Sequence, residues 1–109
     1  ANSEVARPII GPYSASKGAI KMLTKAMAVE WAQYNIQANG LGPGYFLTEL
    51  TKPIAANPEF DKAIRARTPA GKWGNVEDLK GPAIFLASAA SDFVNGHILF
   101  VDGGFLASA

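Results

Sequence analysis

The sequence comprises 109 residues, of which 49% are hydrophobic and 17% are charged, and its net charge is +1. This is the composition of about one globular domain, and the near-zero charge gives no electrostatic basis for binding nucleic acid or an anionic membrane. The absence of cysteine excludes disulfides and thiolate metal sites and is compatible with a reducing compartment. No apolar run approaches the roughly 20 residues of a membrane-spanning helix.

The first ten residues, ANSEVARPII, contain no initiator methionine and neither the basic nor the apolar block of a signal peptide. We therefore expect them to be mid-chain sequence. Because residues 1–12 include Pro8, Gly11 and Pro12, they are predicted to form a loop.

A helix with two apolar faces is predicted from about Tyr13 to Tyr34, because apolar residues recur at spacings of three and four. Only a narrow stripe, including Lys21 and Thr24, is left for water. A helix of this kind needs two partners, such as a sheet behind it and another helix or a subunit in front. One face comprises Ile20, Leu23, Met27, Trp31 and Tyr34, and the other comprises Ala19, Met22, Ala26 and Val29.

Two strands are predicted, over residues 36–41 and 97–101. The first is followed by Gly42-Pro43-Gly44, a loop suited to close approach. Between the strands, a helix start is predicted at Asn57 and Pro58. A loop is predicted over residues 67–75, and a further helix is predicted to be capped by Asn75. Pro82 predicts a kink or a restart in that last helix. Helix, strand, helices and strand indicate an α/β fold with a parallel sheet, whose ligands bind beyond the carboxyl ends of the strands.

Tyr13 and Lys17 are four residues apart and therefore neighbours on one helical face. A tyrosine that exchanges a proton near pH 7 needs its phenolate stabilised by about 4 kcal/mol, since the reference pKa is about 10. A fixed ammonium one turn away supplies part of this. Taken alone, such a pair is far more often an ordinary polar start of a helix.

Four stretches of the chain together resemble the short-chain dehydrogenase/reductase family: YSASKGA, NIQANGLGPGYFLTEL, RTPAGKWGNVEDL and FLASAASDFVNGHILFVDGG. The segments PGYF, TEL, RTP and GKWG are most similar to the branch that contains gluconate 5-dehydrogenases. This resemblance implies that residues 1–109 are the C-terminal part of a single dinucleotide-binding oxidoreductase domain, with a Rossmann-type doubly wound parallel sheet. The N-terminal, cofactor-binding part of the domain is then absent from this chain.

The resemblance also implies roles for individual residues. Tyr13 matches the family's catalytic acid and base, and Lys17 matches the lysine that makes this tyrosine more acidic and holds the nicotinamide ribose. Residues 45–72 match the segment that closes over substrate, with Tyr45 as a substrate-binding residue. The remaining cofactor contacts implied are Pro43 and Gly44 beside the nicotinamide, and the backbone of Phe46 and the hydroxyl of Thr48 on the carboxamide.

The implied activity is hydride transfer between NAD or NADP and a secondary alcohol or ketone, with a sugar acid of the gluconate and 5-ketogluconate type as substrate. A 3-oxoacyl thioester reductase of the same family and a non-catalytic interaction module are the alternatives. The resemblance further implies a cytoplasmic homotetramer. No metal site is expected.

Two features of the family pattern are missing from the chain. The family's catalytic serine precedes the tyrosine by about thirteen positions, which falls before Ala1, whereas Ser3 precedes Tyr13 by only ten and is interpreted as a loop residue. No glycine-rich phosphate loop is present either. We therefore expect the 109-residue chain by itself to have no dehydrogenase activity.

Some further residues carry weaker expectations. Arg65, Arg67 and Lys72 form a basic group that is either a solvated face or a means of attracting an anionic substrate. His97 is expected to be structural, and Asp102 is expected to form a turn before Gly103-Gly104. Trp73 is interpreted as a packing residue, with contact to substrate or a neighbouring subunit as the alternative.

Overall fold

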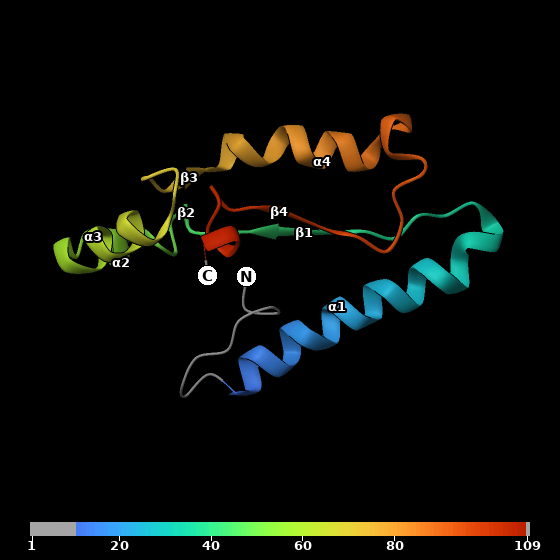
Figure 1. Ribbon diagram of the computed structural model, residues 1–109, viewed down its shortest axis with the longest axis horizontal. Coiled ribbons are helices and arrows are strands. Elements are labelled where there is room, and N and C mark those ends of the chain that lie inside the picture. Colours follow the sequence, from blue (N-terminus) through green and yellow to red (C-terminus); the bar gives the residue numbers. More distant parts are fainter. Residues whose placement is uncertain (1–10, 109) are drawn as a thin grey trace.

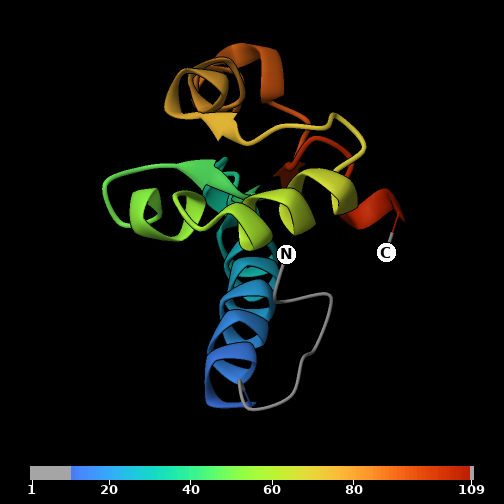
Figure 2. The same cartoon turned by 90° about the vertical axis from the view of Figure 1, so that its left-hand side faces the viewer.

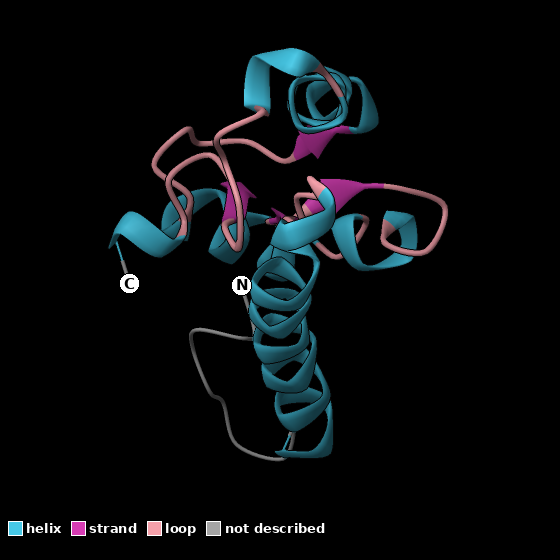
Figure 3. Cartoon of the chain, turned by 90° about the vertical axis from the view of Figure 1, so that its right-hand side faces the viewer, coloured by secondary structure: helices cyan, strands magenta, loops and turns pink. Residues whose placement is uncertain are grey.

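The computed structural model describes residues 11–108, which form a layer of short strands between two helical layers (Figure 1). Helix α4 covers one face of the strands and α1 lies on the other, as the two end-on views show (Figures 2 and 3). Helices α2 and α3 lie beyond one end of the strands. The elements are α1 (Gly11–Trp31), β1 (Gly40–Pro43), β2 (Phe46–Leu47), α2 (Lys52–Ala55), α3 (Pro58–Arg67), β3 (Gly74–Asn75), α4 (Lys80–Ala87) and β4 (Ile98–Val101), with 3₁₀ turns at Ala32–Tyr34, Val76–Leu79, Ala89–Ser91 and Leu106–Ser108.

The strands form two parallel pairs, which confirms the α/β prediction. Strand β1 pairs with β4 in the register Gly40 to Ile98 through Pro43 to Val101. A backbone hydrogen bond from the Gly44 nitrogen to the Val101 carbonyl, 3.0 Å long, extends this ladder past the end of β1. The short strands β2 and β3 pair next to it. The carboxyl ends of β1 and β4 point toward α2 and α3 (Figure 1).

The first strand begins later than predicted, at Gly40 rather than at residue 36. A strand needs a partner, and the positive φ of Gly96 (73°) keeps residues before His97 out of β4. The preceding backbone is instead bonded to side chains: the Ala38 nitrogen donates to Asn95 Oδ1, and Asn39 Nδ2 donates to the Val94 carbonyl.

The segment after Asn75 restarts, as one of the two expectations for Pro82 had it. Asn75 does cap a helical turn, but this turn is 3₁₀, and the α-helix starts afresh at Lys80. Pro82 therefore falls in the first turn of α4, where backbone N–H groups have no helical acceptor and a proline costs little. Asn57 caps α3 as predicted, accepting from the nitrogens of Glu59 and Phe60. Strand β3, at the end of the predicted loop 67–75, was not expected.

Helix α1 presents a different face to the sheet from the one predicted. Thr24, assigned to the water-facing stripe, is buried together with Ala28, and its hydroxyl donates to the Ile20 carbonyl. The apolar faces point outward instead: Met22 is 61% and Val29 79% exposed. Small side chains such as Ala28 allow a close approach to the backbone at Gly96, where a Cβ atom would lie 3.3 Å from the Ala28 methyl group.

Two remaining expectations concern the start of the chain and the membrane. The interpretation of Ser3 and most of the predicted loop lie outside the described residues, while Gly11 and Pro12 belong to the first turn of α1 rather than to a loop. Proline is well suited to a first helical turn. Within residues 11–108 no helix is long and apolar enough to cross a membrane.

Asp61 joins α3 to the loop that precedes β3. Its Oδ1 accepts from the Trp73 indole nitrogen at 2.7 Å and from Arg65 Nε at 2.9 Å. The hydrogen bond from Trp73, and then that from Arg65, lower the pKa of Asp61 below its ordinary 3.8. The folded state therefore favours the ionised carboxylate, and this contribution to stability is present above the unfolded-state pKa and lost as the pH falls through the folded-state pKa.

We predict that Asp61→Asn destabilises the complete protein more at pH 7 than at pH 3, because part of the stabilisation by the carboxylate is already lost from the wild type below the unfolded-state pKa. Urea unfolding of both proteins at the two pH values measures this. Glu49→Gln is the control, since Glu49 pairs only with Lys52 on the surface and such pairs contribute little. An equal loss of unfolding free energy at both pH values would contradict the prediction.

Candidate active site

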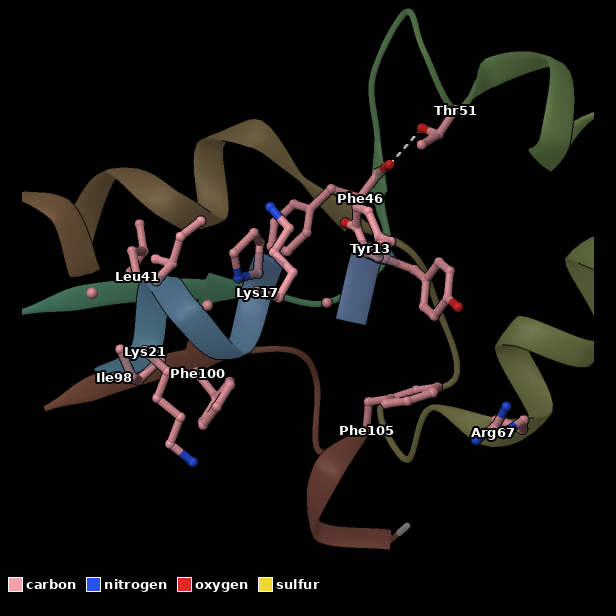
Figure 4. A pocket seen from close by; sticks show the side chains of 16 residues that line it. Tyr13, Lys17, Lys21, Leu41, Phe46, Thr51, Arg67, Ile98, Phe100 and Phe105 are labelled. Carbon is pink, nitrogen blue, oxygen red and sulfur yellow. Dashed lines mark hydrogen bonds between the residues drawn. The ribbon is translucent and has the colours of Figure 1, made fainter. Parts of the chain in front are cut away.

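A cavity of about 400 Å³ lies between the first half of α1 and strands β1 and β4, and it extends past the carboxyl ends of the strands (Figure 4). This is the place at which ligands of parallel sheets bind. The cavity therefore brings together residues from the start, middle and end of the chain. It is lined by Tyr13, Lys17, Ile20 and Lys21 of α1, by residues 40–46, and by Thr51, Arg67, Ile98, Phe100 and Phe105.

Tyr13 and Lys17 face each other at this cavity, as their helical spacing predicts. Lys17 Nζ lies over the Tyr13 ring, 5.3 Å from its centroid, within the range of a cation–π interaction. The Tyr13 side chain is half exposed, so a ligand in the cavity can reach its hydroxyl.

Glycines at the end of β1 let that strand approach β4 closely. A Cβ atom at Gly42 would lie 2.6 Å from the Phe100 ring, and one at Gly44 would lie 2.8 Å from the Asp102 Cα atom. Contacts this short are not seen for real Cβ atoms, so a side chain at Gly42 would have to displace the Phe100 ring, and one at Gly44 would have to displace backbone at Asp102. Pro43 and Gly44 both line the cavity, and Gly44 does so without a side chain.

Aromatic side chains form the wall opposite α1. The Tyr45 ring packs edge-on against Trp73, with centroids 5.9 Å apart, and against Phe105, with centroids 5.5 Å apart. Phe46, Trp73 and Phe105 are buried and belong to the core of the described chain. Trp73 is thus a packing residue, as interpreted, and it reaches Asp61 as well. Tyr45 and Phe46 both line the cavity.

Thr48 is the one predicted cofactor contact that does not line the cavity. Its Oγ1 lies 3.3 Å from Oγ1 of Thr51, and its backbone nitrogen donates to the same Thr51 oxygen at 2.9 Å. Thr51, which does line the cavity, donates to the Phe46 carbonyl (Figure 4). The carboxamide-binding role of Thr48 stays a prediction.

The cavity is positively charged. Among the described residues its lining includes Lys17, Lys21 and Arg67 and no aspartate or glutamate. Lys21 was expected to face water, although its position four residues after Lys17 could have revealed that it shares the face of Tyr13 and Lys17. Arg67 was not distinguished from its basic neighbours in the sequence. The arrangement favours an anionic ligand.

Two residues outside this cavity have the structural roles expected of them. Asp102 forms a turn, because its Oδ1 accepts from the Gly104 nitrogen and its Oδ2 from the Leu106 nitrogen. The backbone of His97 joins Asn39 and Gly40 at the start of β4. Within residues 11–108, no three histidine, aspartate or glutamate side chains come together in a way that could hold a metal ion.

The comparison with known proteins defines the class. A family model described as enoyl-(acyl carrier protein) reductase matches residues 1–106, and the chain belongs to this group of the short-chain dehydrogenase/reductase family. Its α/β fold is the Rossmann type of the dehydrogenases whose structures it matches. The resemblance stated from the sequence is therefore confirmed.

The similar proteins carry gluconate names. The chain is 59% identical over 107 residues to a 2-dehydro-3-deoxy-D-gluconate 5-dehydrogenase of Formosa agariphila, covering 97% of this chain and 40% of that protein. It is 57% identical over 106 residues to a gluconate 5-dehydrogenase of Gluconobacter oxydans, covering 97% and 41%. A gluconate 5-dehydrogenase structure from Burkholderia cenocepacia, in complex with NADP and tartrate, matches with a TM-score of 0.93 and 59% identity, over 99% of this chain and 42% of that one. The chain thus spans about two fifths of the length of these relatives.

Proposed function

We propose that residues 1–109 form the C-terminal part of an NAD(P)-dependent oxidoreductase that interconverts a secondary alcohol and a ketone. The substrate is a sugar acid of the gluconate and 5-ketogluconate type. The observation that carries the proposal is the pairing of Tyr13 with Lys17 in a positively charged cavity at the carboxyl ends of β1 and β4. The names of the similar proteins support the substrate class.

Tyr13 acts as the acid and base of this reaction. In reduction its phenol donates a proton to the substrate carbonyl oxygen, and in oxidation its phenolate accepts the proton of the substrate hydroxyl. Lys17 stabilises the phenolate through its ammonium, which lies over the ring. The nicotinamide cofactor, when bound, supplies or accepts the hydride.

The lining of the cavity is suited to the nicotinamide end of such a cofactor. Pro43 and Gly44, which would lie beside the nicotinamide, both line the cavity. Lys17 would hold the ribose hydroxyls, and the backbone of Phe46 and the hydroxyl of Thr48 would hold the carboxamide. Both NAD and NADP remain part of the proposal, and the NADP bound to the B. cenocepacia relative favours NADP.

The proposal includes a homotetramer. Its support is the outer surface of α1, where Met22, Leu23 and Val29 are more than half exposed. Exposed apolar side chains gathered on one helix are typical of a surface covered in the complete protein. Cytoplasmic location is also proposed, since a sequence without cysteine is compatible with a reducing compartment.

Turnover assays of the complete protein test the substrate class. We predict oxidation of gluconate with NADP⁺ or NAD⁺, and no more than trace reduction of an acetoacetyl thioester, the substrate of the alternative reductase. The 109-residue chain serves as the negative control, because it contains neither a glycine-rich phosphate loop nor a serine at the expected spacing from Tyr13. A preference for the thioester would replace the sugar acid by a 3-oxoacyl thioester as the proposed substrate. Inactivity with both compounds would favour a non-catalytic module. Turnover by the 109-residue chain would contradict its predicted inactivity.

A further inference from the structure

Three cationic side chains lie at or just beyond the end of α3, and the structure separates them. Arg65 is held by Asp61 through a 2.9 Å contact from its Nε to Oδ1. Lys72 lines a second, smaller cavity of about 200 Å³ on the other side of Tyr45 and Phe46. Arg67 alone of the three lines the cavity that contains Tyr13 and Lys17. Of this basic group, Arg67 is therefore the residue placed to contact a ligand in the cavity.

The Arg67 guanidinium lies against an aromatic ring and not against a carboxylate. Its Cζ atom lies 4.7 Å from the centroid of the Phe105 ring, within the range of a cation–π interaction. In the described part of the chain no carboxylate forms an ion pair with it, although Arg65, Lys52 and Lys80 each have one. Phe105 is itself buried and packed against Tyr45. Because Arg67 lines the cavity and has no carboxylate partner among the described residues, its N–H donors are available to a carboxylate ligand.

Arg67 and Tyr13 are placed so that one ligand could contact both residues, each with a different end. Both flank Phe105 at the same end of the cavity, whereas Lys21 lies at the opposite end (Figure 4). In a six-carbon sugar acid oxidised at C5, the carboxylate is at the other end of the carbon chain from the reacting carbon. Such a substrate needs a cation set apart from the acid–base residue.

We propose that Arg67 binds the carboxylate of the sugar-acid substrate while Tyr13 acts on its hydroxyl or carbonyl group. This inference rests on the proposed function. It adds that Arg67 is the residue through which the enzyme distinguishes sugar acids from neutral sugars. Phe105 is a positioning residue in this scheme, because it contacts the guanidinium and fixes its orientation.

The test compares gluconate with gluconamide, its neutral amide, as substrates of the complete enzyme and of Arg67→Ala. We expect the substitution to raise the KM for gluconate about tenfold to a hundredfold, the size of a lost charge-assisted hydrogen bond, and to leave the KM for gluconamide nearly unchanged. The Kd for NADP⁺ is expected to stay at the wild-type value. Arg67→Lys, which keeps the charge and loses the planar fork, is expected to show a smaller rise.

Arg65→Ala is the matched control, since it removes a cation from the same helix two residues away and outside the cavity. It is expected to retain the wild-type preference for gluconate. An Arg67→Ala enzyme that also retains the preference would overturn the inference alone, as would a variant whose defect is confined to the Kd for NADP⁺. A wild-type enzyme that oxidises neither compound would overturn the proposed function and, with it, this inference.

Discussion

Replacing Tyr13 by phenylalanine in the complete protein is expected to lower kcat for gluconate by about a hundredfold to ten-thousandfold, the usual contribution of a general acid or base. The change removes one hydroxyl and leaves the ring over which Lys17 Nζ lies. The remaining cofactor contacts and the shape of the cavity are retained. The Kd for NADP⁺ should therefore stay within about twofold of the wild-type value, well inside the 1.4 kcal/mol of a tenfold change.

Steady-state kinetics and a fluorescence titration with the cofactor measure the two quantities separately. Tyr34→Phe provides the control, because Tyr34 is an exposed tyrosine just after α1 and does not line the cavity. It is expected to leave kcat unchanged. A Tyr13→Phe enzyme with wild-type turnover would exclude Tyr13 as the acid and base, and the pair with Lys17 would then be an ordinary helix start.

The Tyr13–Lys17 pair illustrates what the sequence could predict. Helical geometry alone determines that residues four apart share a face, so the neighbours on α1 follow from their spacing. Similarly, a glycine-rich segment at a strand end predicts close approach, and Gly42 and Gly44 are packed against Phe100 and Asp102. These are local properties of the chain.

The features that the sequence did not predict depend on contacts between distant segments. Strand β1 begins at Gly40 because β4, almost sixty residues later, begins only after the left-handed turn at Gly96. The buried face of α1 is set by the backbone that Ala28 meets, and not by the hydrophobicity of the helix itself. Arg67 was indistinguishable from Arg65 and Lys72 in sequence, since only the contact of Arg67 with Phe105 and the pairing of Arg65 with Asp61 separate them.

Gly44→Ala is the second change with a large expected effect, and it acts on the fold and the site together. The new methyl carbon would lie 2.7 Å from the Asp102 Cβ atom and 2.8 Å from its Cα atom, and a backbone atom cannot move aside as the tip of a side chain can. Overpacking of this kind costs about 1–3 kcal/mol of unfolding free energy. Because the Gly44 nitrogen bonds to the Val101 carbonyl, relief of the clash would separate the ends of β1 and β4.

Urea unfolding of the complete protein and cofactor titration test this expectation, with Gly81→Ala as the matched control. Gly81 lies near the start of α4, and a Cβ atom there meets nothing within 4 Å, so alanine should leave stability equal or raise it by up to about 1 kcal/mol. A Gly44→Ala protein as stable as the wild type would show that the strand ends are farther apart than described. Full stability together with weakened NADP⁺ binding would instead assign the requirement for glycine to the cofactor, because a ligand lying against Gly44 is then the only neighbour that the methyl group disturbs.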